Sequence, residues 1–397
     1  PAASGDVYTL TYYMYGMQDN AVRESVQNAI NAHVEPLIGA NINFVVVSAG
    51  DWNARAVTAL QAGEKIDIFF TADWQGYVNE VTRNLLLPLN DDNGANGNLL
   101  EQYGQGILES LNPAFITGTQ INGVNYAVPT NKELCVPMGF IVNMDAANEV
   151  GLTDPTTQIT CLEDFEPYLA AYKELYPTQY PYLTDGSWGD EPWVPGAVSN
   201  LNGGLINMPQ ECDENGNFDE TWYSVWETDW NREHAELMYK WMQAGYIDPD
   251  SSLSTYADTS LAQYDALTQF NAGEFLVYTA PLKGNNIKGQ ELVNASGNPD
   301  LEVNEIYGQG KYIVTNHSGG SMLAIPVTSE NPVKAMQYIN LMHTDTELLD
   351  MMLYGVPETM WTFSDDGRVE LIDTSWYGAH GAPWTLGNTA IQHVTTK

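Results

Sequence analysis

The sequence predicts an α/β fold in which a mostly parallel sheet is flanked by helices. The first 75 residues read strand, helix, strand, helix, strand, and this order requires parallel strands joined by right-handed crossovers. The chain has 397 residues, which is long enough for two or three domains with separate cores. It contains no run of about 18 apolar residues, so no membrane-spanning helix is expected.

The charge balance excludes several classes of partner. The chain has 51 acidic and 14 basic residues and a formal net charge of -37. Such a surface repels phosphate groups, so neither nucleic acid nor an anionic lipid surface is an expected partner. The acids are spread along the chain, which fits the solubilising surface of an exported protein. The opening residues PAASGDVYT are those expected of a chain from which an export signal has been removed.

The first strand and the first helix have clear periodic patterns. The stretch VYTLTYYMYG alternates and is rich in β-branched and aromatic residues, which is typical of a strand. Val22, Val26 and Ile30 follow at a spacing of four, which predicts a helix with one buried face. Asp19 or Asn20 is the expected cap of this helix.

The third strand ends at polar residues that are candidates for ligand contact. INFVVVS reads as a buried strand, and a second helix is expected from Asp51 to about Gly63. The strand IDIFF follows and stops in the residues TADW, which include Asp73 and Trp74. Ligands in open parallel sheets lie beyond the carboxyl ends of the strands, so this turn is where we expect a ligand.

The middle of the chain predicts a crossing followed by a helical region. Asn122 and Gly123 form the expected turn of a hairpin. The extended run after it is interrupted by Pro129 and Pro137, which suits a segment that crosses between domains. Helical patterns, including CLEDFEPYLAAYKELYP and NREHAELMYKWMQAGYI, dominate residues 143–275.

The last third of the chain predicts strands followed by paired helices. FNAGEFLVYTAP reads as a helix end, a tight turn and a strand, and SMLAIPVT reads as another strand. A helix is expected to begin near Pro332, because proline is favoured in the first turn of a helix. FSDDGRVELID is the expected last hairpin.

No metal or cofactor is expected. Cys135, Cys161 and Cys212 lack the spacing of a zinc site, and buried small side chains describe them better than a disulfide framework does. DENGNFDE lacks glycine at the sixth position of a calcium loop. Its Asn215 and Gly216 predict a hairpin turn instead.

Three stretches resemble a known family. YGVPETMW, FNAGEFLVYTAP and IPVTSENPVKAMQYINLMHTDTELLDMM are similar to segments of the extracellular solute-binding proteins of ABC transporters. The resemblance is narrower to the sugar-binding cluster that includes maltose-binding protein and a lipoprotein-type branch of Gram-positive bacteria. It covers most of the chain in the order of its patterns.

The resemblance implies a two-lobed, periplasmic-binding-protein-like fold of type II with the ligand cleft between the lobes. Each lobe is then a mostly parallel sheet flanked by helices. One lobe is expected at residues 1–128 plus 306–353, and the other at 129–305 plus 354–397. Capture is expected to occur by closure, because a ligand that contacts both lobes favours the closed state.

The implied function is that of an exported substrate-binding protein of an ABC importer, not an enzyme. It would capture a carbohydrate, with an oligosaccharide favoured, and deliver it to the permease subunits in the membrane. The resemblance also implies a monomer at the cell surface, lipid-anchored through a removed N-terminal segment. Alternatives are a binding protein for a peptide or other small polar solute, and a secreted glycoside hydrolase. The motifs G-x-S-x-G and H-E-x-x-H are absent, but 51 carboxylates leave a hydrolytic pair open.

Sugar chemistry directs the choice of candidate contacts. Protein sites bind sugars with aromatic faces that cover C–H groups, and with carboxylates and amides that bind hydroxyls. The chain has 11 Trp and 23 Tyr. The candidate ligand contacts are Tyr15, Gln18, Asp73, Trp74, Glu133, Trp188, Trp193, Tyr278, Lys283, His317, Trp361, Trp376 and Trp384.

Some candidates depend more on the family than on local pattern. Ligand contacts in the family occur in the loop that holds Asp73 and Trp74 and just after the crossing that holds Glu133. Lys283 stands near the position where sugar binders of the family have an aromatic residue, for which Tyr278 would substitute. A packing role is the alternative for each single tryptophan.

Overall fold

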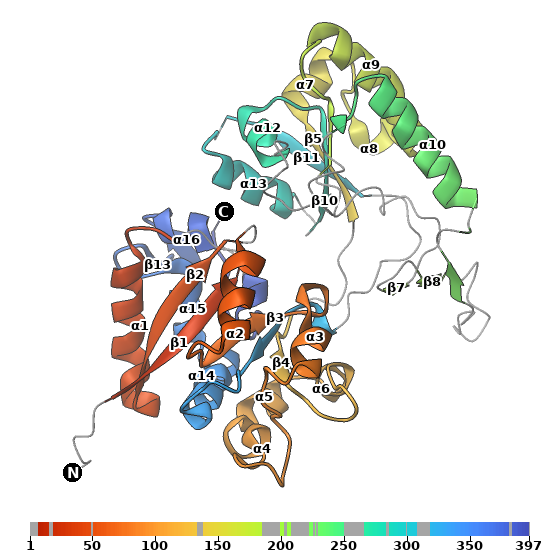
Figure 1. Cartoon of the computed structure of the whole chain (residues 1–397). Helices are drawn as coiled ribbons and strands as arrows, with labels where there is room; N and C mark the ends of the chain where they lie inside the picture. Colours follow the sequence, from red (N-terminus) through yellow and green to blue (C-terminus); the bar gives the residue numbers. More distant parts are fainter. Residues whose placement is uncertain are drawn as a thin grey trace, which may run out of the picture. The chain divides into compact units, whose positions relative to one another are not determined.

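The protein is described by a computed structural model whose chain divides into two compact units (Figure 1). The described residues are 7–15, 19–48, 51–132, 138–184, 199–201, 205–207, 222–224, 227, 229–249, 266–282, 286–298, 300–307, 318–380 and 383–396. The first unit comprises Pro1–Glu133 and His317–Lys397, and the second unit comprises Leu134–Asn316. Each unit has its own hydrophobic core.

The unit boundaries differ from those expected from the sequence. The expected lobes were 1–128 plus 306–353 and 129–305 plus 354–397, whereas residues 354–397 belong to the first unit. The chain turns back at Gly355, whose φ is 90°. The indole of Trp376 then donates a hydrogen bond to the Met352 carbonyl at 2.9 Å. The segment after the paired helices therefore packs against them and does not cross to the second unit.

The first unit is built on a five-stranded sheet with the order β2-β1-β3-β12-β4. Its strands are β1 (Tyr8–Tyr15), β2 (Ala40–Val47), β3 (Ile68–Thr71), β4 (Ala127–Pro129) and β12 (Met322–Ala324). Strand β1 pairs in parallel with both β2 and β3, which confirms the predicted β-α-β-α-β order. Strand β12 runs antiparallel to β3 and β4, so the return segment inserts between strands that precede it by about 250 and about 190 residues.

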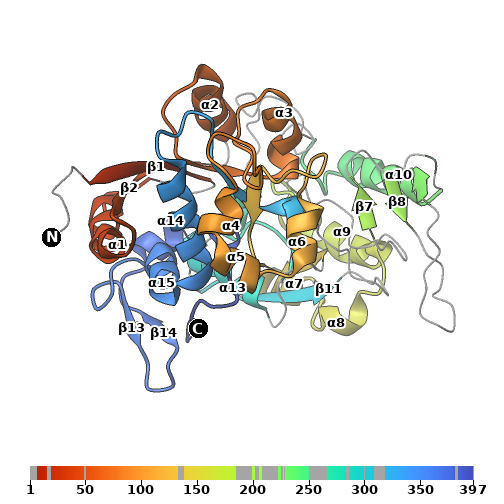
Figure 2. The same cartoon turned by 90° about the horizontal axis from the view of Figure 1, so that it is seen from below.

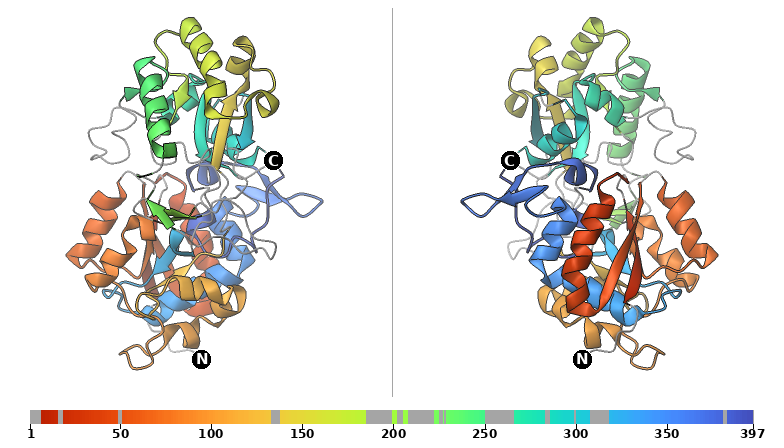
Figure 3. Two further views of the ribbon diagram at one scale, coloured as in Figure 1. Left: turned by 90° about the vertical axis from the view of Figure 1, so that its right-hand side faces the viewer. Right: turned by 90° about the vertical axis from the view of Figure 1, so that its left-hand side faces the viewer.

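Helices and short turns surround this sheet. They are α1 (Arg23–Ile38), η1 (Asn53–Val57), α2 (Thr58–Ala62), η2 (Asp73–Gln75), α3 (Tyr77–Thr82), α4 (Leu99–Tyr103), α5 (Gln105–Ser110), α6 (Pro113–Gly118), η7 (Ser318–Gly320), α14 (Pro332–Thr344), α15 (Thr346–Tyr354), α16 (Ser375–His380) and η8 (Pro383–Thr385). Helices α1, α14 and α15 lie together on one side of the unit (Figures 2 and 3).

The two faces of β1 bury different sets of side chains because side chains alternate along a strand. Leu10, Tyr12 and Met14 pack into the core formed with α1, α14 and α15. Tyr13 and Tyr15 point to the opposite face and pack with a second set of apolar side chains from η1, α2 and β3. Tyr15, the last residue of β1, therefore lies on the same face of the sheet as the η1 and α2 side chains and close to the carboxyl end of β3.

The ends of two helices can be compared with their expected caps. Helix α1 begins after Val22 without a side-chain cap, because Asp19 forms an ion pair with Arg23 at 2.7 Å. The Asn20 side chain accepts a hydrogen bond from the Val22 N–H at 3.2 Å, but Val22 precedes the first residue of the helix, so this bond does not cap α1. Helix α14 begins at Pro332 as predicted, with the Asn331 side chain as its cap.

Two of the three predicted hairpins lie within the described residues, and both form as predicted. Asn122 and Gly123 have φ values of 52° and 82°, and an isolated bridge joins the residues on either side of them, as in the favoured two-residue turn. Strands β13 (Trp361–Phe363) and β14 (Val369–Leu371) form the last hairpin. The turn expected at Asn215 and Gly216 lies outside the described residues.

The second unit is a four-stranded sheet with helices on both faces (Figure 1). Its strands have the order β11-β5-β10-β6. Strand β5 runs antiparallel to β11 and β10, and only β6 is parallel to β10, so the expectation of a mostly parallel sheet is wrong for this unit. The elements are β5 (Met138–Asn143), α7 (Met144–Glu149), α8 (Pro155–Gln158), η3 (Leu162–Phe165), α9 (Glu166–Leu175), β6 (Tyr182–Leu183), α10 (Asp229–Gln243), α12 (Ala266–Ala272), β10 (Val277–Pro281), α13 (Ile287–Ser296) and β11 (Val303–Tyr307). A separate three-stranded sheet contains β7 (Ser199–Leu201), β8 (Leu205–Asn207) and β9 (Trp222–Ser224).

Alternation along β5 also explains the two-sided packing of the second unit. Phe140 and Val142 enter the core beside α9 and α10, whereas Ile141 enters the core beside α12 and α13. The predicted helix, tight turn and strand in FNAGEFLVYTAP are α12, a turn at Gly273 with φ of 73°, and β10. Within the described residues, no helix combines the length and apolar character needed to cross a membrane.

Candidate functional site

Four aromatic rings meet at the carboxyl ends of β1 and β3 in the first unit. They belong to Tyr15, Phe70, Trp74 and Trp384, and we call them the ring cluster. The ring centroids of Tyr15 and Trp74 are 5.5 Å apart, those of Tyr15 and Trp384 are 6.0 Å apart, and those of Trp74 and Trp384 are 6.2 Å apart. Tyr15 also stacks on Phe70 with centroids 4.6 Å apart. These distances are within the range of stabilising ring pairs.

The ring cluster extends from the core to the surface. Phe70 is fully buried, Tyr15 is 8% exposed, and Trp74 is 46% exposed; Trp384 is partly buried. Burial raises the pKa of the Tyr15 hydroxyl, so this tyrosine is neutral at physiological pH. The inner rings thus hold the outer indole in place, and Trp74 presents apolar area to solvent.

The indole of Trp74 is fixed by a hydrogen bond to a distant segment. Its Nε1 donates to the Gly320 carbonyl in η7 at 2.7 Å. The neighbouring Gln75 donates from Nε2 to the Tyr15 hydroxyl at 3.3 Å. Because its N–H group is used inside the protein, Trp74 offers a ligand the carbon surface of its ring.

The carboxylate of Asp73 in η2 lies against Gly319 in η7. A Cβ atom added to Gly319 would overlap Asp73 Oδ2 and would lie 2.6 Å from Asp73 Cγ. Only glycine leaves room for the carboxylate at this point. Both side chains of the pair Asp73 and Trp74 are therefore positioned by η7.

A short C-terminal segment positions the third ring. The Trp384 carbonyl accepts a hydrogen bond from Ser321 Oγ at 2.5 Å. Three residues later, a Cβ on Gly387 would lie 2.7 Å from the carbonyl carbon of Met342 and 2.8 Å from its Cβ. The next residue, Asn388, donates its backbone N–H to the Met342 carbonyl at 3.0 Å. Close backbone contact with α14 therefore determines where Trp384 lies.

The same segment is joined to the chain that follows β4. The Asn131 N–H donates to the Gly387 carbonyl at 2.9 Å, and the Thr389 N–H donates to the Asn131 carbonyl at 2.9 Å. The amide of Asn131 also donates to Asn388 Oδ1 at 2.9 Å. These paired bonds attach the segment that holds Trp384 to the last described residues of the first unit before the second unit begins.

A buried carboxyl group supports the turn that carries Asp73 and Trp74. Glu80 on α3 is 4% exposed and accepts a hydrogen bond from Thr71 Oγ1 at 2.6 Å. Burial raises the pKa of Glu80 to about 7, although the hydroxyl of Thr71 opposes the shift. The charged form of Glu80 is therefore disfavoured by folding.

The raised pKa predicts a pH dependence of stability. The folded pKa is about 7 and the ordinary value is 4.5, so the folded state binds more protons between these values and the free energy of unfolding falls as pH rises through this window. Relative to wild type, Glu80→Gln should gain up to about 3 kcal/mol between pH 4.5 and pH 8. Urea unfolding at both pH values measures the gain. Parallel profiles for Glu80→Gln and wild type would contradict the assignment.

The remaining candidates lie elsewhere. Trp361 and Trp376 are 4% and 0% exposed, within the core of the first unit, and their indoles donate to the Gly355 and Met352 carbonyls. Tyr278 is 7% exposed in the core of the second unit. These rings are used for packing, so we leave them out of the proposed site. The candidates outside the described residues are Gln18, Glu133, Trp188, Trp193, Lys283 and His317.

The partners of the turn that holds Asp73 and Trp74 were not predicted from the sequence. Gly319 and Gly320 contact these two side chains, and Gln75 holds Tyr15. Two adjacent glycines after His317 were the available signal, because glycine often marks a close approach of another group to the backbone. Among the described residues, no three His, Cys, Asp or Glu side chains are placed to hold a metal ion.

Comparison with known proteins identifies the family. Residues 37–357 match the family described as bacterial extracellular solute-binding protein. The chain belongs to this family. The match confirms the resemblance found in the sequence and the expectation of a binding protein, in place of a hydrolase.

Individual relatives are more distant. A carbohydrate ABC transporter substrate-binding protein of Streptococcus pneumoniae is 26% identical over 400 residues, which cover 99% of this chain and 74% of that protein. The crystal structure of an N-glycan transport solute-binding protein from Streptococcus pneumoniae with Man1GlcNAc has a TM-score of 0.74 at 20% identity, covering 98% of this chain and 80% of that one. An alginate-binding protein has a TM-score of 0.64 at 14% identity, covering 94% and 74%. These structures confirm the two-lobed α/β class of fold.

Proposed function

We propose that this solute-binding protein captures a carbohydrate for an ABC importer and that the ring cluster is part of its binding site. The observation that carries the proposal is an exposed indole that is held by other rings at the carboxyl ends of β1 and β3. Trp74 is 46% exposed, although a large apolar ring gains from burial. A sugar ring would cover it with its C–H face, while Asp73 beside it would accept hydrogen bonds from hydroxyl groups.

The relatives support an oligosaccharide. The Streptococcus pneumoniae protein that matches nearly the whole chain is named for carbohydrate transport, and structures of similar fold were solved with Man1GlcNAc and Man5GlcNAc. The ring cluster also presents two accessible indoles, Trp74 and Trp384, and two indoles can each cover the face of a separate sugar unit. We therefore favour an oligosaccharide over a monosaccharide as the transported ligand.

Partners and location follow from the same proposal. The carbohydrate would pass to the permease subunits in the membrane, and the protein would act as a monomer outside the cell through a lipid anchor. Capture by closure of the two units stays a prediction from the family resemblance. No cofactor takes part in the proposed function.

A panel of oligosaccharides tests the function. The protein is incubated with N-glycan fragments that contain mannose and N-acetylglucosamine, with galactose-based disaccharides and with alginate oligomers. Melting temperature is recorded and the sugars are then analysed by chromatography. A binding protein raises its melting temperature with at least one sugar and returns that sugar intact. Loss of the sugar to products, or no shift with any sugar, would overturn the proposal.

Gly319 provides a separate test of the position of Asp73. In Gly319→Ala the added Cβ would overlap the end of the Asp73 side chain, which can rotate away at little cost to the fold. We expect the affinity for the selected glycan to fall about tenfold, or about 1.4 kcal/mol, while the free energy of unfolding changes by less than about 1 kcal/mol. Calorimetric titration and urea unfolding measure the two effects.

The matched control is Gly94→Ala. Its Cβ would lie 3.0 Å from Asp91 Oδ2 in a loop outside the ring cluster, so it also places a methyl group against a carboxylate, although less closely, and it does not move Asp73. This variant should bind as wild type does. Equal affinities for Gly319→Ala and Gly94→Ala would remove Asp73 from the proposed site.

A further inference from the structure

The two accessible indoles of the ring cluster use their N–H groups differently. Trp74 Nε1 donates to the Gly320 carbonyl at 2.7 Å. Trp384 is partly buried, and its Nε1 donates to no group in the described part of the chain. The buried side-chain nitrogens that lack a partner include those of Trp52 and Trp241 but not that of Trp384. The N–H group of Trp384 is therefore open to solvent and to a ligand.

The other indoles of the first unit show that a free, accessible N–H group is unusual here. Trp361 Nε1 and Trp376 Nε1 each donate to a backbone carbonyl at 2.9 Å. Trp52 is fully buried, and its unpartnered Nε1 is enclosed where no ligand can reach it. Among the tryptophans in the described part of the first unit, Trp384 therefore supplies the indole donor that a ligand can use.

The indole of Trp384 is held in place by the protein itself. The ring centroids of Tyr15, Phe70 and Trp74 lie 6.0, 5.9 and 6.2 Å from that of Trp384. The backbone carbonyl of Trp384 also accepts a hydrogen bond from Ser321 Oγ at 2.5 Å. A donor on a ring that is already fixed loses little entropy when it binds an acceptor.

A sugar that covers the two indoles meets a different requirement at each. The ring planes of Trp74 and Trp384 are inclined at 51°, so the face of a single pyranose cannot lie flat on both. A sugar on Trp74 needs only an apolar face, because that N–H group is already paired. A sugar on Trp384 displaces water from the N–H group, and a donor that is left unpaired when it is buried opposes binding. The sugar must therefore bring an acceptor oxygen to Trp384.

We propose that Trp384 is a specificity-determining residue of the carbohydrate site, because its indole N–H donates to one oxygen atom of the bound glycan. Trp74 contributes only the face of its ring. This inference rests on the proposed function and adds a chemical requirement to it: a glycan that lacks the accepting oxygen is rejected. Trp384 lies outside residues 37–357, which match the family, so family membership does not imply this role.

The test removes the N–H group and keeps the ring. In Trp384→benzothienylalanine, a sulfur atom takes the place of the indole N–H. The N-glycan fragments and galactose-based disaccharides of the panel are titrated into this variant and into wild type by calorimetry. We expect the affinity for the bound sugar to fall about five- to tenfold, with an unchanged midpoint of urea unfolding. Trp74→benzothienylalanine should instead lower the urea midpoint, because it loses the bond to Gly320.

Analogues of the bound sugar that each lack one oxygen identify the acceptor. In wild type, the analogue without the accepting oxygen should bind about five- to tenfold more weakly than the parent sugar. In Trp384→benzothienylalanine, this analogue and the parent sugar should bind equally, because the hydrogen bond is already absent. Such non-additivity is expected of two groups that contact each other.

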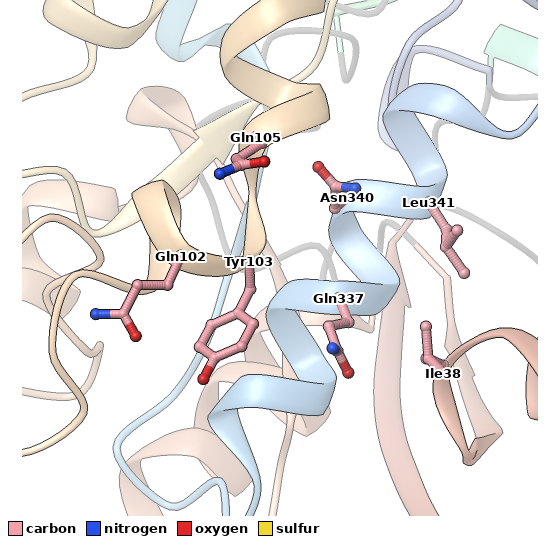
Figure 4. A pocket seen from close by; sticks show the side chains of 7 residues that line it. All are labelled: Ile38, Gln102, Tyr103, Gln105, Gln337, Asn340 and Leu341. Carbon is pink, nitrogen blue, oxygen red and sulfur yellow. The ribbon is translucent and has the colours of Figure 1, made fainter.

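The control variant is Tyr103→Phe. Tyr103 lines a hollow of the first unit that lies outside the ring cluster, beside Gln337 and Asn340 of α14 (Figure 4). The variant removes the polar hydrogen of a partly exposed aromatic ring, as the change at Trp384 does. It should leave the affinity for every sugar unchanged.

A measurement without sugar separates this role from the proposed function. The exchange of indole N–H hydrogens with water is followed by NMR of protein with isotope-labelled tryptophan, and the signals are assigned with Trp384→Phe and Trp74→Phe. We expect faster exchange at Trp384 than at Trp74, whose N–H group is bonded to Gly320. Equal exchange at the two indoles, or equal sugar affinities of wild type and Trp384→benzothienylalanine, would overturn this role and leave the proposed function standing. Binding of no panel sugar to wild type would overturn both.

Discussion

Replacing Trp74 with alanine is expected to weaken glycan binding by at least tenfold while the fold is kept. The side chain is 46% exposed, so its removal takes little from the core. It does remove the apolar surface that the proposal assigns to the sugar, and a loss of about 1.4 kcal/mol or more corresponds to the tenfold change. Calorimetric titration with the glycan selected from the panel measures the effect.

Two further variants define the cause of that loss. Trp74→Phe keeps a ring face but lacks the N–H group that donates to Gly320 at 2.7 Å, so it should recover part of the affinity. Phe363→Ala on β13 removes a ring of matched exposure, 48%, outside the ring cluster and should have no effect. If Trp74→Ala binds as tightly as Phe363→Ala does, Trp74 is not a ligand contact.

Gly387→Ala is expected to give the largest loss of stability among single methyl additions in this region. Its Cβ would meet the backbone of Met342, with 2.7 Å to the carbonyl carbon and 2.8 Å to Cβ. A shift of the α14 backbone would break the bond from the Asn388 N–H to the Met342 carbonyl. A shift of the Gly387 segment would break its bonds to Asn131. We expect a loss of about 3 kcal/mol in the free energy of unfolding, measured by urea unfolding.

The comparison variant is again Gly94→Ala, where the nearest atom is the end of a flexible carboxylate. It should change the free energy of unfolding by less than about 1 kcal/mol. Similar unfolding midpoints for the two variants would show that the segment carrying Trp384 is not anchored on α14 as described.

The fold of the first unit was predictable wherever apolar residues recur at the regular spacing of a strand or a helix. The alternation in β1 and the spacing of Val26 and Ile30 gave the correct elements and the parallel pairing. The expected cap of α1 was not found, because Asp19 is used by Arg23. The placement of residues 354–397 came from a family likeness alone. The turn at Gly355 and the bond from Trp376 to Met352 are not visible in any short stretch of sequence.

The candidate site was predictable only in part. Strand-end logic selected Tyr15, Asp73 and Trp74, and the structure brings Tyr15 and Trp74 together with Trp384. The residues that hold them come from η7, about 245 positions later in the chain, and no local pattern connects the two segments. Trp361 and Trp376 also stand in polar, glycine-containing stretches, yet they are buried. A tryptophan in such a stretch can therefore face either the core or a ligand.

The central claim is that a carbohydrate lies on the ring cluster of the first unit. Hydrogen–deuterium exchange with and without the selected glycan tests this location directly. We predict slower exchange in the backbone of residues 72–77, 318–322 and 384–388 when the glycan is bound, because η2, η7 and η8 carry or hold the rings. Slower exchange confined to other segments, with these three unchanged at saturating glycan, would contradict the account.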